Sequence, residues 1–190
     1  MDFITSLPTS KGFDSILSTV DHELTKGIIL VLCKKTITAD ELASILLTHL
    51  YRWFGLPDKM ISDWGLQFVV CSFQALLNKL GIKLSLSTTF HPQSDRTTKR
   101  YNQEIKTYLS IYYTAHPHSW VDHLPFLEFA HNSRRHSDQQ TTLFELIYGT
   151  APKPIPTVTT ISNLPAVKLR LEFLDKIWQE ATAAHELAAK

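Results

Sequence analysis

The stretch that decides the fold is GIILVLC, at residues 27–33. After its glycine this stretch is apolar at every position, so it offers no polar face to water. A strand of this kind is covered on both sides, as in a layered fold of helices on a sheet. Two weaker strand patterns precede it, at residues 2–7 and 15–20, with a turn around Gly12 between them. We therefore expect three antiparallel strands at the start of the chain.

Helix and strand patterns alternate after this strand. Thr38 and Glu41 are spaced as a capping box, which predicts the start of a helix that ends at Gly55 and Pro57. The apolar stripe of this helix is expected at Leu42, Leu46, Leu50 and Trp53. Three further elements are predicted: a strand at 59–63, a helix at 73–80 and a strand at 82–86.

The second half of the chain is predicted to be helical. Ser94 is expected to cap a long helix, and Ser119 is expected to open a second helix that Pro125 bends. The buried stripe of the first is expected at Tyr101, Ile105, Tyr108, Leu109 and Tyr112. The buried stripe of the second is expected at Trp120, Leu124, Leu127 and Ala130.

Together these patterns predict an α/β fold. Its centre is a mixed five-stranded sheet flanked by helices on both faces, and a C-terminal helical tail follows. We expect one domain at residues 1–149, a Pro- and Thr-rich linker at 150–165, and an amphipathic helix at 166–190.

Composition and charge exclude several classes of protein. Hydrophobic residues make up 44% of the 190 residues and the net charge is +1, as in a globular domain and unlike a disordered or strongly basic chain. Cys33 and Cys71 do not form a CxxC pair, which argues against a zinc knuckle and a disulfide scaffold and favours a reducing compartment. The apolar runs are too short for a membrane span, and the N-terminal segment does not have the pattern of a secretory signal.

Three ordered motifs carry the chemistry of the chain: MDFITSLP at 1–8, SDWGLQF at 62–68 and HPQSD at 91–95. With YNQ at 101–103 and FELIYG at 144–149, they resemble the integrase catalytic core of gypsy-class long-terminal-repeat retrotransposons, a family related to retroviral integrases. The resemblance covers roughly the first 150 residues. It implies a ribonuclease-H-like fold, which agrees with the order of strands and helices.

The resemblance also implies a metal site for phosphodiester chemistry. Such enzymes hold two divalent cations, Mg²⁺ or Mn²⁺, between two Asp side chains and one Glu side chain. The Asp positions correspond to Asp2 and Asp63, and the Glu position is occupied here by Lys99.

Lys99 differs from the Glu that the resemblance implies at this position, and the difference affects metal binding. An ammonium about 4 Å from a divalent cation meets a repulsion of about 8 kcal/mol at an effective dielectric constant of about 20. Arg96 also stands where the family usually has Gly, and Asp2 lies at the start of the sequence, where we expect a strand end to fray. We therefore predict that integrase activity is absent or very weak.

A basic helix face is the expected nucleic-acid contact. Arg96, Lys99, Gln103 and Lys106 share one face of the long helix, with Arg100 beside it, and the resemblance brings the loop with His91 and Gln93 close to DNA. A solvated face without a ligand is the equally favoured alternative.

Two functions remain open from the sequence. The first is an integrase core that transfers DNA strands, a role that implies a DNA partner, a homodimer and a nuclear location. The second is an inactive or domesticated module that keeps the fold and binds DNA or RNA, or oligomerises. A further possibility is a partner-binding role through the tail helix. Neither reading includes a membrane.

Overall fold

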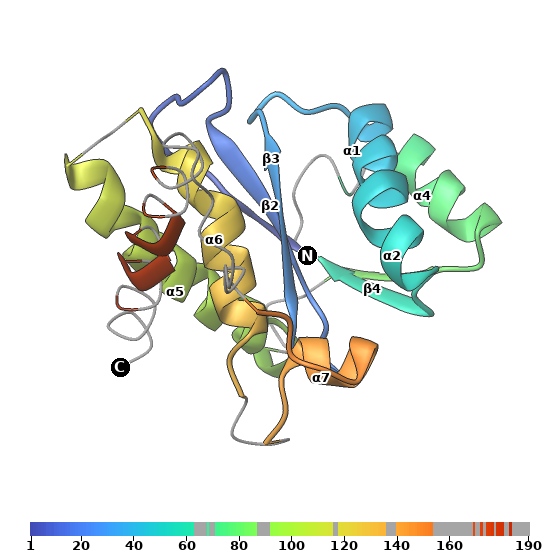
Figure 1. Ribbon diagram of the computed structural model, residues 1–190. Coiled ribbons are helices and arrows are strands. Elements are labelled where there is room, and N and C mark those ends of the chain that lie inside the picture. Colours follow the sequence, from blue (N-terminus) through green and yellow to red (C-terminus); the bar gives the residue numbers. More distant parts are fainter. Residues whose placement is uncertain are drawn as a thin grey trace. The chain divides into compact units, whose positions relative to one another are not determined.

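The computed structural model describes most of the chain (Figure 1). The chain divides into two compact units. The first unit is Met1–Val20 with Ile29–Gln103, and the second is Asp21–Ile28 with Glu104–Lys190. The described residues are 1–62, 68, 71–86, 92–115, 118–135, 140–153, 169, 172, 174–176, 178–180 and 183.

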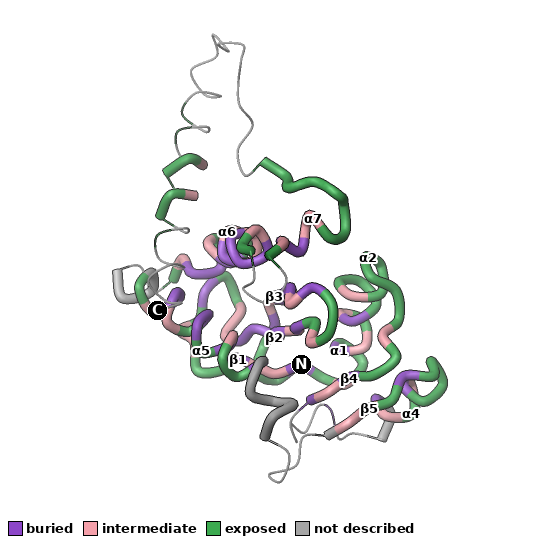
Figure 2. Tube along the Cα trace, turned by 90° about the horizontal axis from the view of Figure 1, so that it is seen from below, coloured by how far each residue is buried: buried purple, intermediate pink, exposed green. Residues whose placement is uncertain are grey.

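A three-stranded sheet organises the first unit. Its order is β1 (Asp2–Ile4), β2 (Ser15–Val20) and β3 (Ile28–Cys33), and β1 runs antiparallel to β2 with Asp2 opposite Ser18. Most positions along β2 and β3 are buried, as expected for strands covered on both sides (Figure 2). The first strand is shorter than predicted, because Ser6 has a φ of 65° and so leaves the extended conformation.

The predicted capping box begins the first helix. The Thr38 hydroxyl accepts from the Glu41 backbone N–H at 3.3 Å, and Glu41 Oε2 accepts from the Thr38 N–H at 2.7 Å. Helix α1 (Ala39–Ile45) continues into a π-helical segment, η1 (Leu46–Tyr51), and then α2 (Arg52–Phe54), where Gly55 ends it at a φ of 77°.

One residue of the predicted apolar stripe is wrongly placed. Leu42 and Leu46 are buried, but Trp53 is 62% exposed. The reason is the π-helical segment: it has more residues per turn than an α-helix, so the 3.6-residue period used for the prediction drifts before it reaches Trp53.

The fourth and fifth strands form beside a crossover helix, as predicted. Strand β4 (Lys59–Ser62) runs parallel to β5 (Lys83–Leu86), and α4 (Cys71–Lys79) connects them in the sequence. Within the described residues they pair as a two-stranded sheet apart from β1–β3. The Met1 backbone nitrogen donates to the Ile61 carbonyl at 2.6 Å and so links the beginning of β1 to β4.

Three helices follow along the chain. Helix α5 (Pro92–Ala115) begins at Pro92, so Ser94 lies inside the helix and the predicted cap at Ser94 is wrong; proline is compatible with a first helical turn. The predicted stripe is confirmed at Ile105, Tyr108 and Leu109, which are at most 2% exposed. Tyr101 is intermediate, and the Tyr112 side chain lies outside the described residues.

Helix α6 (Trp120–Asn132) matches its prediction closely. Ser119 is its N-cap residue, and the helix continues through Pro125. The side chains expected to face inward are all buried: Trp120, Leu124, Leu127 and Ala130. The Asn132 amide at its end pairs with both backbone polar groups of Ile28, at 2.9 Å each, which ties the helix to the beginning of β3.

Helix α7 (Leu143–Tyr148) was not predicted. It begins with a second capping box, between Thr142 and Glu145, and ends at Gly149, whose φ is 72°. The same pattern that located the helix after Thr38 therefore locates this one, and the FELIYG motif lies on it.

The tail is described only in part. Trp178 contacts Phe129 of α6 edge to face, with ring centroids 5.3 Å apart. The predicted linker at 150–165 lies mainly outside the described residues, and the helix at 166–190 is described at scattered positions only. Among the described residues, none of the helices is both long and apolar enough to cross a membrane.

Candidate functional site

The Asp2 carboxylate accepts hydrogen bonds from its own strand and from the long helix. The backbone N–H of Phe3 donates to Oδ1 at 2.8 Å, and the side-chain amide of Asn102 donates to Oδ2 at 2.7 Å. Asp2 is half-buried on β1, and Asn102 belongs to α5, 100 residues later. The first residue of the predicted metal site is therefore fixed to the long helix.

Ser18 fixes the other end of the Asn102 amide. Its hydroxyl donates to Asn102 Oδ1 at 2.5 Å and lies 3.3 Å from the Asp2 carbonyl oxygen. Ser18 is directly opposite Asp2 in the β1–β2 register, and Ser18 and Asn102 are both buried. Because the amide oxygen accepts from Ser18, its nitrogen is the atom that faces the carboxylate.

Lys99 lies on α5 one turn before Asn102. Residues three apart in a helix are neighbours on its surface. Lys99 is therefore a neighbour of Asn102, the residue of α5 that contacts Asp2. The Lys99 residue is exposed, whereas Thr98 beside it is buried at 2% exposure.

Some of the remaining predicted site residues lie outside the described part of the structure, and the others are exposed on α5. Asp63 and His91 lie outside the described residues, and Gln93 and Arg96 lie in the first turns of α5 with side chains outside them. Three residues of the predicted basic face are exposed on α5: Arg100, Gln103 and Lys106.

The described donor atoms do not fit a two-metal site. The Asp2 oxygens accept hydrogen bonds from Phe3 and Asn102, and a carboxylate is a ligand type that suits a hard divalent cation. Lys99, at the position that the sequence predicts for the third carboxylate, carries an ammonium. Within the described part of the chain, His, Cys, Asp and Glu side chains do not gather in any group of three or more suited to a metal ion.

Cys33 is unsuited to nucleophilic chemistry. It is buried on β3, and burial raises the pKa of its thiol to about 11, with the Asp14 charge adding to the effect. The thiol stays protonated at neutral pH, so it serves as a small apolar residue of the core formed with Leu17 and Val31.

Sequence reasoning missed the roles of Ser18 and Asn102. Asn102 belongs to the YNQ motif and lies between two stripe positions, Tyr101 and Ile105. A polar residue next to a buried stripe is the one available signal, since buried amides need partners.

Comparison with known proteins gives a consistent picture. No protein-family model matches the chain. It is 33% identical over 156 residues to the Transposon Tf2-3 and Tf2-4 polyproteins of Schizosaccharomyces pombe, a match that covers 82% of this chain and 12% of each polyprotein. The chain thus spans only a small part of the relatives it matches.

Solved structures with a similar fold are viral integrases. A simian T-cell lymphotropic virus intasome, in complex with PP2A regulatory subunit B56 gamma, matches with a TM-score of 0.63 and 21% identity, over 86% of this chain and 59% of that one. The HTLV-2 integrase catalytic core with magnesium matches with a TM-score of 0.58 and 19% identity, over 77% and 93%. The BIV integrase core matches with a TM-score of 0.57 and 19% identity, over 78% and 93%.

These likenesses confirm the ribonuclease-H-like fold, and the Tf2 relationship gives the ancestry. The likeness to the Tf2 polyproteins and the shared fold together support an integrase core domain by ancestry.

Proposed function

We propose that this integrase core binds DNA but has little or no strand-transfer activity. The observation that carries the proposal is the hydrogen bond from Asn102 to Asp2, because it joins the predicted first metal ligand to the part of α5 that bears Lys99. A cation one turn from that contact works against a divalent metal at Asp2.

Mg²⁺ or Mn²⁺ is the cofactor that the family relationship supports, and one related viral core was solved with magnesium. In this chain Asp2 and Asp63 are the two carboxylates that would hold it. Two carboxylates neutralise less of the positive charge of two divalent ions than three carboxylates would. The ammonium of Lys99 adds a further positive charge. We therefore assign this chain no metal-dependent step.

The exposed residues of α5 support the nucleic-acid role. Arg100, Gln103 and Lys106 present two cations and one amide to solvent within two turns of one helix. Such groups bind phosphate oxygens and position a duplex without reading its sequence. DNA is the substrate that follows from the family, and a homodimer and a nuclear location follow from the same role.

Metal binding tests the central claim. We expect Mn²⁺ to bind the Lys99→Glu variant roughly tenfold or more tightly than the unaltered chain, because a repelling charge becomes a ligand. Lys106→Glu is the matched control, since it makes the same charge change two turns later on α5. Equal Mn²⁺ affinity of the unaltered chain and Lys99→Glu contradicts the proposal.

Strand transfer tests the loss of activity directly. With Mg²⁺ or Mn²⁺ and oligonucleotide substrates, the unaltered chain is expected to give no measurable product. Turnover by the unaltered chain that Asp63→Ala abolishes would show a working metal site and overturn this part of the proposal.

A domesticated binding module is the second candidate, and Lys99 is the observation that favours it. Such a module binds DNA or RNA with a strong dependence on salt and no requirement for a divalent metal. Binding that needs Mn²⁺ would instead favour a working integrase site. The proposed division into a core at 1–149, a linker at 150–165 and a tail helix at 166–190 applies to both candidates.

A further inference from the structure

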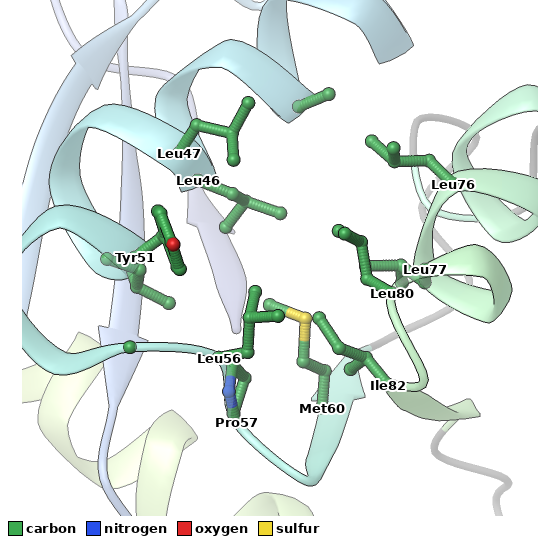
Figure 3. Close-up of a pocket in the computed structure, with 13 residues that line it drawn as sticks. Leu46, Leu47, Tyr51, Leu56, Pro57, Met60, Leu76, Leu77, Leu80 and Ile82 are labelled. Atoms are coloured by element: carbon green, nitrogen blue, oxygen red, sulfur yellow. The ribbon is translucent and has the colours of Figure 1, made fainter.

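One face of strands β4 and β5 is turned away from the apolar core of the first unit. Met60 of β4, and Ile82 just before β5, are buried in that core and point into the hollow between η1 and α4 (Figure 3). Leu84 of β5 packs against the same core. Because successive side chains of a strand point to opposite faces, the residues that alternate with these three lie on the other face. They are Lys59 and Ile61 of β4 and Lys83 and Ser85 of β5.

The Asp2 side chain lies on the same side of the first unit. Met1 belongs to the core cluster and Phe3 packs against it, so Asp2, between them on β1, points the other way. The Met1 backbone nitrogen donates to the Ile61 carbonyl at 2.6 Å, which places the beginning of β1 beside β4 (Figure 2). The predicted first metal ligand therefore faces the same side as Lys59 and Lys83.

Lys59 and Lys83 form a pair of cations on this face. They are direct partners in the parallel β4–β5 register, and both are exposed. Neighbouring strands lie about 4.8 Å apart, so the two side chains start close together. Among the described residues, neither lysine forms an ion pair with a carboxylate. Two such cations repel each other, and an anion that contacts both relieves the repulsion. We call these two residues the β4–β5 lysine pair.

Protection of a sheet edge explains only one of the two lysines. A lysine on an edge strand keeps other chains from pairing with it, and within the described residues β5 pairs on one side only, with β4. Strand β4 is different, because it has β5 on one side and accepts the bond from Met1 on the other. Lys59 therefore does not guard an edge, and a ligand that engages both strands accounts for the pair.

We propose that the β4–β5 lysine pair binds backbone phosphates of DNA, as a contact additional to the exposed residues of α5. The proposal rests on the DNA-binding role proposed above and extends it to a second element of the first unit. Lys59 lies two residues, about 7 Å, along β4 from Ile61, which is bonded to the strand of Asp2. A DNA strand carries one phosphate per about 3.4 Å of helix axis, so a strand that passes Asp2 has further phosphates within reach of the pair.

The salt dependence of DNA binding tests the pair. Fluorescence anisotropy with a labelled duplex is measured at several salt concentrations for the unaltered chain, for Lys59→Gln, for Lys83→Gln and for the double variant. Each single substitution is expected to reduce the slope of log affinity against log salt concentration by about one, and the double variant by about two. An unchanged slope in the double variant overturns the proposal.

A second pair of exposed lysines provides the matched control. Lys34 and Lys35 are adjacent and directly follow β3, so Lys34→Gln with Lys35→Gln removes the same charge elsewhere in the first unit. This variant is expected to leave the slope unchanged. An equal reduction of the slope in the control would mean that any two lysines contribute alike, and the assignment to the β4–β5 lysine pair would be wrong.

Two further variants separate a ligand contact from a structural effect. Lys59→Arg with Lys83→Arg keeps both charges and is expected to keep the slope; a slope reduced by two in this variant overturns the proposal. Because the two ammonium groups repel each other, the Lys59→Gln, Lys83→Gln double variant is expected to unfold at the same urea concentration as the unaltered chain or at a higher one. Unfolding at a lower concentration would show that the pair supports the sheet, against the proposal.

The results also distinguish this inference from the proposed function. If the unaltered chain does not bind DNA, both are wrong. If Arg100→Gln reduces the slope and the double variant of the β4–β5 lysine pair does not, DNA binding is confined to α5 and only this inference fails. If the double variant instead loses affinity for a labelled poly-glutamate peptide and keeps its DNA slope, the pair binds an acidic protein and the proposal is wrong.

Discussion

The side-chain amide of Asn102 joins Asp2 to Ser18, with hydrogen bonds of 2.7 Å to the Asp2 carboxylate and 2.5 Å from the Ser18 hydroxyl. Asp2 and Ser18 are cross-strand partners, so one amide fastens both strands to α5. The contact explains why a polar residue lies buried beside the apolar stripe of that helix. It also makes the Asp2 carboxylate a structural group as well as a predicted metal ligand.

Asn102→Ala should lower the free energy of unfolding by about 1–3 kcal/mol, because it leaves the buried Ser18 hydroxyl and the Asp2 carboxylate without this partner. Urea denaturation measures the change. Gln103→Ala is the control, since Gln103 is the exposed neighbour on the same helix. A similar loss in both variants would mean that the buried amide makes no specific contribution, because alanine raises the helix propensity at both positions.

The elements predicted most accurately are those marked by a pattern within a short stretch of the sequence. The capping box at Thr38 located a helix start, and the stripe of α6 was confirmed at every position. The prediction that Trp53 is buried was wrong because a π-helical segment changes the helical period on which the prediction rests. The contact of Asn102 with Asp2 joins residues 100 apart, and local patterns carry no information on such pairs.

Asn132→Ala should destabilise the second unit by about 2–4 kcal/mol, since it leaves both the N–H and the carbonyl of Ile28 without their buried partner. Asn132→Asp should be nearly as harmful, because a carboxylate can accept from the N–H but cannot donate to the carbonyl. Thermal unfolding of the two variants measures this. If Asn132→Asp is as stable as the unaltered chain, the donated bond contributes little.

Arg100→Gln and Lys106→Gln should each weaken DNA binding about equally for all sequences. Each should also reduce the slope of log affinity against log salt concentration by about one. Fluorescence anisotropy at several salt concentrations gives both quantities. Lys153→Gln removes an exposed charge outside α5 and should leave the slope unchanged. An unaltered slope in the α5 variants would favour the solvated helix face over a nucleic-acid contact.

Asp21 should titrate below the ordinary aspartate value of 3.8. Burial by itself raises the pKa of this carboxyl, but hydrogen bonds from Thr25, Glu23 and Leu24 outweigh burial and lower it. Because the folded pKa is the lower one, the stabilisation is complete above pH 3.8 and is lost as the pH falls through the folded value. An NMR titration of the Asp21 side chain should therefore show a midpoint under 3.8 that moves upward in Thr25→Val, which removes the hydroxyl donor to Oδ2. A midpoint at or above 3.8 in the unaltered chain would mean that burial outweighs the hydrogen bonds of this loop.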